Sequence, residues 1–261
     1  MAKINSTLRK HAPKFLSLFA FLLLWQLVVT VFRIKEFILP SPAATFATLF
    51  VPAQAAQYTW IKHIQATLAE ILASFVMTAV SGFLIALAIT WSRFLNRIVT
   101  PILTLFNSLP KIALAPLFLI WFGYGIIPNI MIAVLIAFFP VVINTATGLN
   151  AVEEDLLDLV RYLHARKLQV FLKIRIPGSL PYIFSGFKIS TTLCVVGAIV
   201  GEFIASNQGL GFLLKDSQAM IDSPPMFASL ILISVLGLGL FGLISLLERA
   251  AMPWQRSAAP A

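Results

Sequence analysis

The stretch "IIPNIMIAVLIAFFPVVINTATGL" (residues 126–149) contains no charged side chain from one end to the other. A helix needs about 20 mainly apolar residues to cross the hydrocarbon core of a bilayer. The whole chain shares this character, because 59% of its 261 residues are hydrophobic and only 11% are charged. A water-soluble fold of this length could not cover so much apolar surface. The sequence therefore predicts an all-α integral membrane protein.

Six apolar segments are predicted to span the membrane. They are residues 15–32, 67–91, 99–122, 126–149, 183–203 and 227–247. The first could be a signal peptide, but its apolar run is longer than usual and no small-residue cleavage site follows, so it is interpreted as a retained span. We expect a single domain over residues 1–261, with a core of roughly 64–250 and the extra span before it.

The formal charge of +9 lies in short basic blocks between the apolar runs. This arrangement suits the anionic cytoplasmic face of a bilayer, with lipid rather than nucleic acid as the partner. Six spans put both termini on one side, and that side would hold thirteen Lys and Arg residues against four on the other. Because basic residues favour the cytoplasmic loops, both termini are predicted to be cytoplasmic.

The largest basic block is "RYLHARKLQVFLKIRIPGSLP" (residues 161–181), in which cations alternate with apolar side chains. Its pattern predicts two short helices joined by a turn at residues 164–166. Pro177 is expected to end the second helix, and Pro181 to lead into the next span. The segment could lie flat on anionic lipid or present an apolar ridge to a cytoplasmic partner. The turn and the two prolines favour the docking interpretation.

This block resembles the cytoplasmic loop of permease subunits of ATP-binding cassette (ABC) importers. That loop reads Glu-Ala-Ala, three residues, Gly, nine residues, Ile, one residue and Leu-Pro. Here Asp158, Leu159 and Val160 stand at the first three places, His164 at the glycine, and Ile174, Ile176 and Pro177 at the end. Of these positions, His164 departs most from the pattern of the family, because the turn there favours a positive φ that His adopts less readily than Gly.

Two further segments, "SLPKIALAPLFLIWFGYG" (108–125) and "GEFIASNQGLGFLL" (201–214), are similar to the nitrate, sulfonate and taurine branch of these importers. The resemblance implies a permease subunit of the bacterial cytoplasmic (inner) membrane, not an enzyme. It would form the pathway for a small solute, either sulfonate-, nitrate- or taurine-like or a small organic such as a pyrimidine precursor. A periplasmic or lipid-anchored solute-binding protein would deliver that solute.

The implied partners are two copies of a cytoplasmic ABC ATPase and a second permease, as a homodimer. The sequence has no phosphate-binding loop of the form G-x-x-x-x-G-K-[ST]. We therefore expect no cofactor on this chain, and ATP would be used by the partner subunit. The resemblance assigns ATPase coupling to ten residues. They are Asp158, Leu159, Val160, Arg161, Leu163, His164, Ala165, Ile174, Ile176 and Pro177.

Charged residues within the spans are candidates for the pathway, because a charge at membrane depth is costly. Lys111 lies between two prolines, where the helix is predicted to break, and it could line the pathway or reach water. Glu202 is a second candidate, although a structural role in holding the turn at Gly209 and Gly211 is favoured. Glu70 is expected at a helix end or in an ion pair. Few other polar side chains are expected along the pathway.

Other classes of function find less support. The three histidines are scattered, Cys194 stands alone, and no catalytic set or metal-ligand spacing occurs within one span. An ion-coupled secondary transporter or channel is the alternative, and it would need buried ionisable groups near the midplane. Small-residue spacings at Gly197 and Gly201, and at Gly237, Gly239 and Gly242, could form a seam between two permeases or allow close packing within the chain, and packing within the chain is favoured for both.

Overall fold

The computed structural model describes residues 2–254, with the side chains of residues 2–15, 18, 54 and 161 left aside. Several basic residues that predicted the orientation therefore lie outside the described part. They are Arg256 and the side chains of Lys3, Arg9, Lys10, Lys14 and Arg161.

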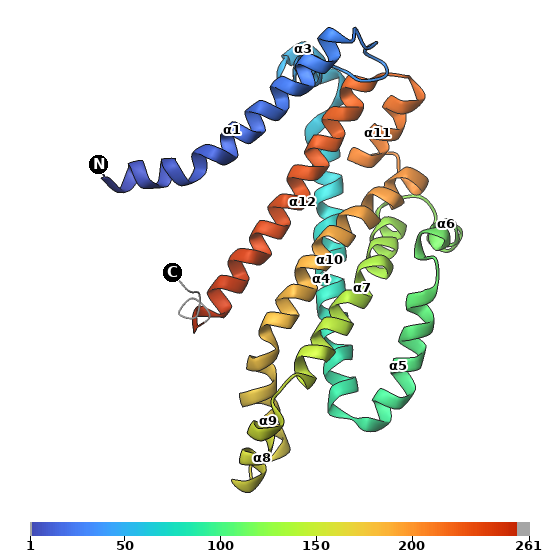
Figure 1. Ribbon diagram of the computed structural model, residues 1–261. Helices are drawn as coiled ribbons and strands as arrows, with labels where there is room; N and C mark the ends of the chain where they lie inside the picture. The colour runs from blue at the N-terminus through green and yellow to red at the C-terminus, as the bar shows by residue number, and fades with distance from the viewer. Residues whose placement is uncertain (1, 255–261) are drawn as a thin grey trace.

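The described residues form helices and no strand, which confirms the predicted all-α class (Figure 1). The helices are α1 (Ala2–Val31), α2 (Pro42–Phe50), α3 (Pro52–Tyr58), α4 (Trp60–Trp91), α5 (Arg93–Ser108), η1 (Lys111–Leu114), α6 (Ala115–Phe122), α7 (Ile126–Asn150), α8 (Glu154–Tyr162), α9 (Lys167–Val170), η2 (Phe171–Arg175), α10 (Ile176–Ala205), α11 (Leu210–Ala219) and α12 (Ser223–Ala251).

Four helical rods are long and apolar enough to cross a membrane among the described residues. They are α4, α7, the rod from Lys167 to Ala205, and α12. The pair α5 and η1–α6 is also apolar but is bent by 85°, as in a broken span or a re-entrant loop. Of α1, the described stretch Phe19–Val31 forms a shorter apolar helix. The predicted total of six spans therefore stays a prediction.

The bend occurs where the sequence predicted a broken helix. Leu109 has extended backbone angles, φ −71° and ψ 142°, as a residue before proline prefers. Pro110 also has no N–H to continue the hydrogen-bond ladder of α5. The predicted break around Lys111 is thus confirmed.

The core is the packing of α10 against α7 and α4. A Cβ added at Gly197 would lie 2.4 Å from the Cα of Ala133, and one at Gly201 would lie 2.6 Å from the Cα of Asn129. These glycines let α10 lie directly against α7, as predicted. The same expectation is wrong for Gly239 and Gly242, because a Cβ at either would meet nothing within 4 Å.

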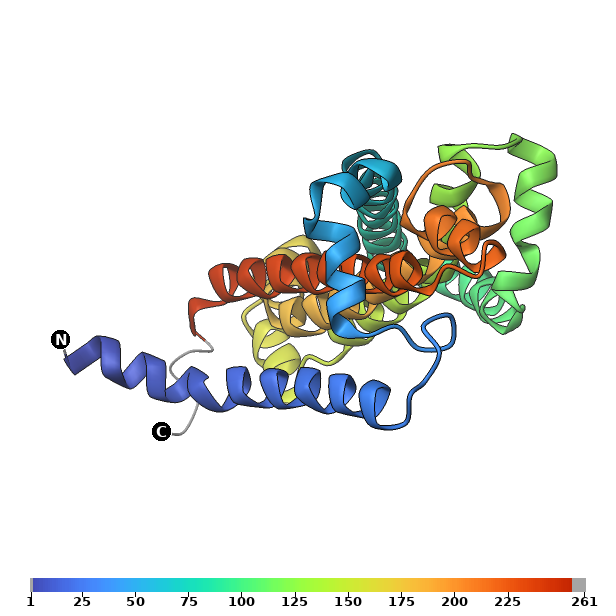
Figure 2. The same ribbon diagram turned by 90° about the horizontal axis from the view of Figure 1, so that it is seen from above.

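The molecule has two distinct ends (Figure 1). The short helices α2, α3 and α11 cluster at one end, and α8 and α9 lie at the other. Helix α1 lies to one side of the bundle, as Figure 2 also shows, and its Trp25 donates a hydrogen bond to the carbonyl oxygen of Pro40 at 3.1 Å. An ion pair between Lys188 and Glu248 joins α10 to α12.

Candidate functional site

Helix α5 carries a row of polar side chains on one face. Asn96, Thr100, Thr104 and Asn107 are spaced by four, four and three residues, which keeps them aligned on α5. The hydroxyl of Thr100 donates to Oδ1 of Asn96 at 2.5 Å, and Nζ of Lys111 donates to Oδ1 of Asn107 at 2.8 Å. We call Asn96, Thr100, Thr104 and Asn107 the polar ladder, and Lys111 follows it in η1, beyond the bend.

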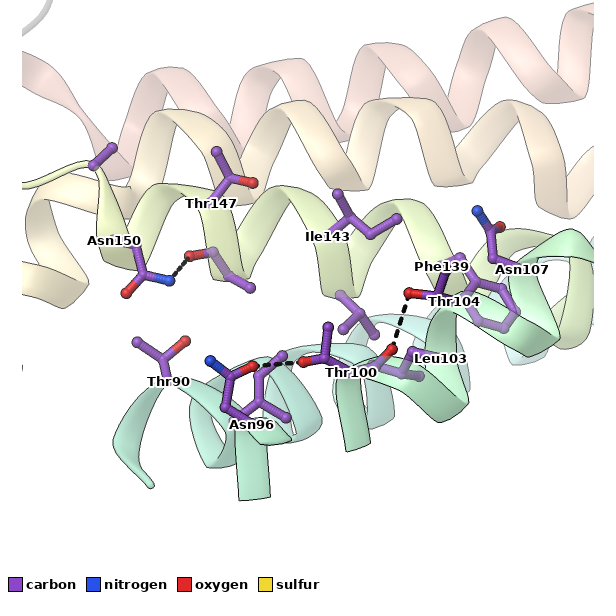
Figure 3. A pocket seen from close by; sticks show the side chains of 14 residues that line it. Thr90, Asn96, Thr100, Leu103, Thr104, Asn107, Phe139, Ile143, Thr147 and Asn150 are labelled. Atoms are coloured by element: carbon purple, nitrogen blue, oxygen red, sulfur yellow. Dashed lines mark hydrogen bonds between the residues drawn. The ribbon is translucent and has the colours of Figure 1, made fainter. Parts of the chain in front are cut away.

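The polar ladder borders a groove of about 590 Å³ between α5, α7 and the end of α4. In Figure 3, Thr147 and Asn150 of α7 and Thr90 of α4 line the same space. None of the described residues that line the groove is acidic. At one end Nζ of Lys111 lies 4.5 Å from the ring centre of Phe139, a lining residue. The groove thus offers amides and hydroxyls to a polar solute, with one cation close by.

A second cavity of about 550 Å³ continues from this groove, and Thr90, Asn96 and Asn150 line both. Its described lining includes three cations and no acid. The cations are Arg93, Lys167 and Arg175. Val160 and Ala165 of the predicted coupling loop also line it. The polar groove therefore leads directly to the loop.

The loop has the turn that the sequence predicted. Helix α8 ends at Tyr162, α9 begins at Lys167, and His164 between them has φ 53°. The N–H of Ala165 donates to the carbonyl oxygen of Val160 at 3.0 Å, the bond that closes a helix end with a left-handed residue. His164 thus adopts the positive φ expected of the position where the resembling loops have Gly.

The outer face of the loop is an apolar ridge. Leu159, Leu163 and Leu168 are 54%, 66% and 56% exposed. Val160 and Ala165 face inward to the second cavity. Asp158 and Arg161 belong to α8 as well. The docking role of this ridge stays a prediction, and its exposure matches what that role requires.

Pro177 does not end the second helix, and that part of the prediction is wrong. The chain runs as one rod from Lys167 to Ala205, 39 residues long, which includes Ile174, Ile176 and Pro177. A π-helical turn over Phe171–Arg175 precedes the proline, in which the N–H of Ile176 donates to the carbonyl oxygen of Phe171. This wider spacing accommodates the missing N–H of Pro177 without a break.

Glu202 lies away from the groove, at the turn between α10 and α11. Its side chain is fully buried and accepts hydrogen bonds from the hydroxyl of Thr67, at 2.5 Å, and from the N–H of Gly211. Gly209 has φ 111°, and a Cβ there would lie 2.2 Å from the carboxyl carbon of Glu202. The carboxylate therefore holds this turn, as favoured from the sequence. A role in the pathway remains untested for both Lys111 and Glu202.

Two features differ from the expectation. The groove beside α5 holds more polar groups than the sequence was expected to offer, and the regular spacing of the polar ladder was the signal for them. Glu70 is neither at a helix end nor in an ion pair, because α4 begins at Trp60 rather than at Thr67. It is 1% exposed, and its Oε1 accepts a hydrogen bond from Asn129 at 2.8 Å.

Comparisons with known proteins complete this picture. A family model described as "Binding-protein-dependent transport system inner membrane component" matches residues 80–252. The formylaminopyrimidine transport permease protein ThiX of Halalkalibacterium halodurans is 34% identical over 222 residues, 85% of this chain and 88% of that protein. The riboflavin transport system permease protein RibX of Chloroflexus aurantiacus is 32% identical over 241 residues, covering 92% and 89%. A chain of the inward-facing MetNI methionine ABC transporter shares the fold, with a TM-score of 0.64 at 20% identity over 73% of this chain and 95% of that one.

Proposed function

The chain belongs to the family of binding-protein-dependent transport system inner membrane components, and from that premise we propose which of its parts do the work. It is a permease subunit of an ABC importer and a multi-pass protein of the inner membrane. Its partners are an ATPase and a solute-binding protein. In our proposal, the groove beside α5 carries the solute and the α8–α9 loop docks the ATPase.

The groove is suited to a pathway because its polar groups are neutral and closely spaced. The ladder presents hydroxyl and amide groups along α5, with the amide of Asn150 across from it on α7. A solute can exchange one hydrogen-bond partner for the next along such a row without meeting an acidic side chain. Lys111 supplies a positive charge near one end, which favours solutes with anionic or electron-rich groups.

The observation that carries the coupling proposal is the continuous rod from Lys167 to Ala205. Its first turns belong to the docking loop, and its later turns pack against α7, which lines the groove. In the middle, the hydroxyl of Ser190 donates to the carbonyl oxygen of Ala137 on α7 at 3.0 Å. A displacement of the loop by the ATPase therefore reaches the groove wall through packed helices rather than through a flexible linker.

We assign the second permease to an identical copy and one ATPase to each copy. In this arrangement both termini and the α8–α9 loop face the cytoplasm, and α2, α3 and α11 face the binding protein. The 13-to-4 bias of basic residues supports this orientation. No cofactor is assigned to this chain, because ATP is bound by the partner.

The solute we propose is small, of the sulfonate, nitrate or taurine type or a pyrimidine precursor. Two relatives are named for formylaminopyrimidine and riboflavin. The groove supports either class, because amides and hydroxyls bind heterocycles as well as oxyanions, and the Phe139 ring lies beside Lys111. Uptake by the full transporter with its binding protein, measured for taurine and for formylaminopyrimidine in competition, separates the two classes.

The docking proposal is tested by Leu159→Asp and Leu163→Asp, which place charge on the apolar ridge. We expect each variant to lose the ATPase subunit in a pull-down from detergent. The matched control is Gln57→Asp on α3, which adds the same charge at an exposed position at the opposite end of the molecule. Retention of the ATPase by both ridge variants, with transport intact, would show that the loop is not the docking site.

An ion-coupled secondary transporter remains the competing function. The buried carboxyl groups of Glu70 and Glu202 would be its natural ion-coupling groups. However, neither lines the groove, and Glu202 is bonded to the α10–α11 turn. Uptake by the purified chain alone in liposomes, driven by a proton or sodium gradient, would support that alternative and contradict the permease proposal.

A further inference from the structure

Two carboxyl groups face each other in the interior of the helix bundle. Glu70 of α4 is 1% exposed and Glu202 of α10 is 0% exposed. Thr67, one turn before Glu70 on α4, donates a hydrogen bond to Glu202. Asn129, which donates to Glu70, lies against Gly201 next to Glu202, so both carboxyl groups reach the same part of the bundle. In the part of the chain that the structure describes, no Lys or Arg forms an ion pair with either. Two negative charges buried without a cation are costly, so the charge of the pair must be reduced or stabilised in another way.

The surroundings of Glu202 suit its ionised form. It accepts hydrogen bonds from the hydroxyl of Thr67 and from the backbone N–H of Gly211. This N–H belongs to the first turn of α11, where the helix dipole favours a negative charge. The ionised carboxylate of Glu202 is therefore stabilised by hydrogen-bond donors, without a cation.

Glu70 has a different environment. Its Oε1 accepts a hydrogen bond from Nδ2 of Asn129 at 2.8 Å. Its Oε2 is buried and finds no partner among the described residues. A buried oxygen without a partner is costly, and two ionised carboxylates in contact inside a protein repel each other strongly. A proton on Oε2, donated to Glu202, removes both problems at once.

We propose that Glu70 and Glu202 form a buried proton-binding site, which holds one proton between two carboxyl groups and thereby fixes the α10–α11 turn against α4. The ligand is a proton, and no metal ion is needed. This site is separate from the groove and from the docking loop. It therefore adds to the transport function and does not depend on it.

The turn is fastened to α4 by contacts on both sides of the carboxyl pair. The N–H of Leu210 donates to the hydroxyl oxygen of Thr67 at 2.8 Å, and Thr67 in turn donates to Glu202. The N–H of Gly209 donates to Nδ1 of His63 at 3.0 Å. Loss of the shared proton places a second negative charge beside Glu202. That charge drives the two carboxylates apart and loosens α11 from α4.

Other titratable groups near the turn must be separated from the pair. On α4 they are Lys62 and His63, and on α11 they are Lys215 and Asp216. Helix α7 contributes the amide of Asn129 and has no titratable side chain. His63 is the main competitor, because it is a titratable group whose Nδ1 accepts a hydrogen bond from the N–H of Gly209 in the same turn.

Hydrogen exchange of the turn amides tests the proposal on the full transporter in lipid nanodiscs. After correction for intrinsic rates, exchange at residues 209–212 of the wild type should rise at least about ten-fold between about pH 6 and about pH 9. In Glu70→Gln the amide donates to Glu202 without a proton to lose, so exchange should stay slow throughout. In His63→Asn, which keeps a bonding group near Nδ1, the pH dependence should match the wild type.

Two results would overturn the proposal. One is exchange at the turn that does not change with pH in the wild type. The other is a pH dependence that survives in Glu70→Gln and disappears in His63→Asn. Infrared spectroscopy gives a readout that needs no variant: the wild type should show the carbonyl stretch of a buried protonated carboxylic acid, which is lost at alkaline pH. Absence of that band in the wild type would also contradict the proposal.

Discussion

The contact between α7 and α10 gives the sharpest quantitative prediction, for the change Gly197→Ala. The added Cβ would lie 2.4 Å from the Cα and 2.9 Å from the Cβ of Ala133. Carbon atoms in contact need about 3.5 to 4.0 Å, so the two helices must separate by roughly 1 Å. The nearest obstacle is backbone, which no side-chain rotation can move aside. We therefore expect a cost of about 1 to 3 kcal/mol from overpacking.

The matched control is Gly178→Ala in the same helix, where an added Cβ meets nothing within 4 Å. Alanine stabilises a helix by about 1 kcal/mol relative to glycine. Gly178→Ala should gain this stability without a steric clash, whereas in Gly197→Ala the clash opposes it. The two variants should thus differ by about 2 to 4 kcal/mol. For a chain of this length, that is a difference of roughly 4 to 16 °C in unfolding temperature.

Cys194 provides the assay, because it is fully buried and lies one turn before Gly197 on α10. On heating, a thiol-reactive fluorophore labels it only when α10 leaves the core. The labelled permease band is then quantified on a gel, which separates it from partner subunits. If Gly197→Ala and Gly178→Ala expose Cys194 at the same temperature, the close packing of α10 on α7 is wrong.

Three further changes test other parts of the fold. Gly209→Ala should destabilise the protein by more than about 3 kcal/mol, measured as lost thermal stability, since φ is 111° and the Cβ would meet the carboxyl of Glu202. His164→Gly should raise stability by about 1 kcal/mol in the same assay, because Gly adopts φ 53° without strain. Burial and the Asp222 carboxylate raise the pKa of Tyr58 to about 12, so its contribution to stability is complete below about pH 10 and is lost as the pH rises through 12. Tyr58→Phe should remove that part of the alkaline loss of stability.

The four long apolar rods followed from the sequence because the transfer of apolar side chains into lipid depends on local composition. The predicted segment 126–149 differs from α7 by one residue at its end. The turn at His164 and the break near Pro110 were also local features, readable from residue type and spacing. The continuity of the helix through Pro177 could not be predicted from the sequence. It depends on a π-helical turn at Phe171–Arg175, for which the sequence has no recognisable pattern.

The two polar clusters also differ in how far the sequence could predict them. The polar ladder lies on one helix, so its spacing alone contained the information. The pair of Glu70 and Glu202 joins residues 132 positions apart, and only the crossing of α4 and α10 brings them together. A single sequence shows each carboxyl as an isolated charge in an apolar run, for which a helix end is the simplest interpretation.

One rod connects the two ends of this molecule. The helix from Lys167 to Ala205 has 39 residues and is therefore about 58 Å long. It begins at the α8–α9 loop, passes the tight contact at Gly197, and reaches Glu202 near its last turn. A shift of this rod along its axis moves the carboxylate relative to Thr67 and Glu70, which belong to a different helix. The proposed docking site at one end and the proposed proton-binding site at the other therefore lie on the same helical rod.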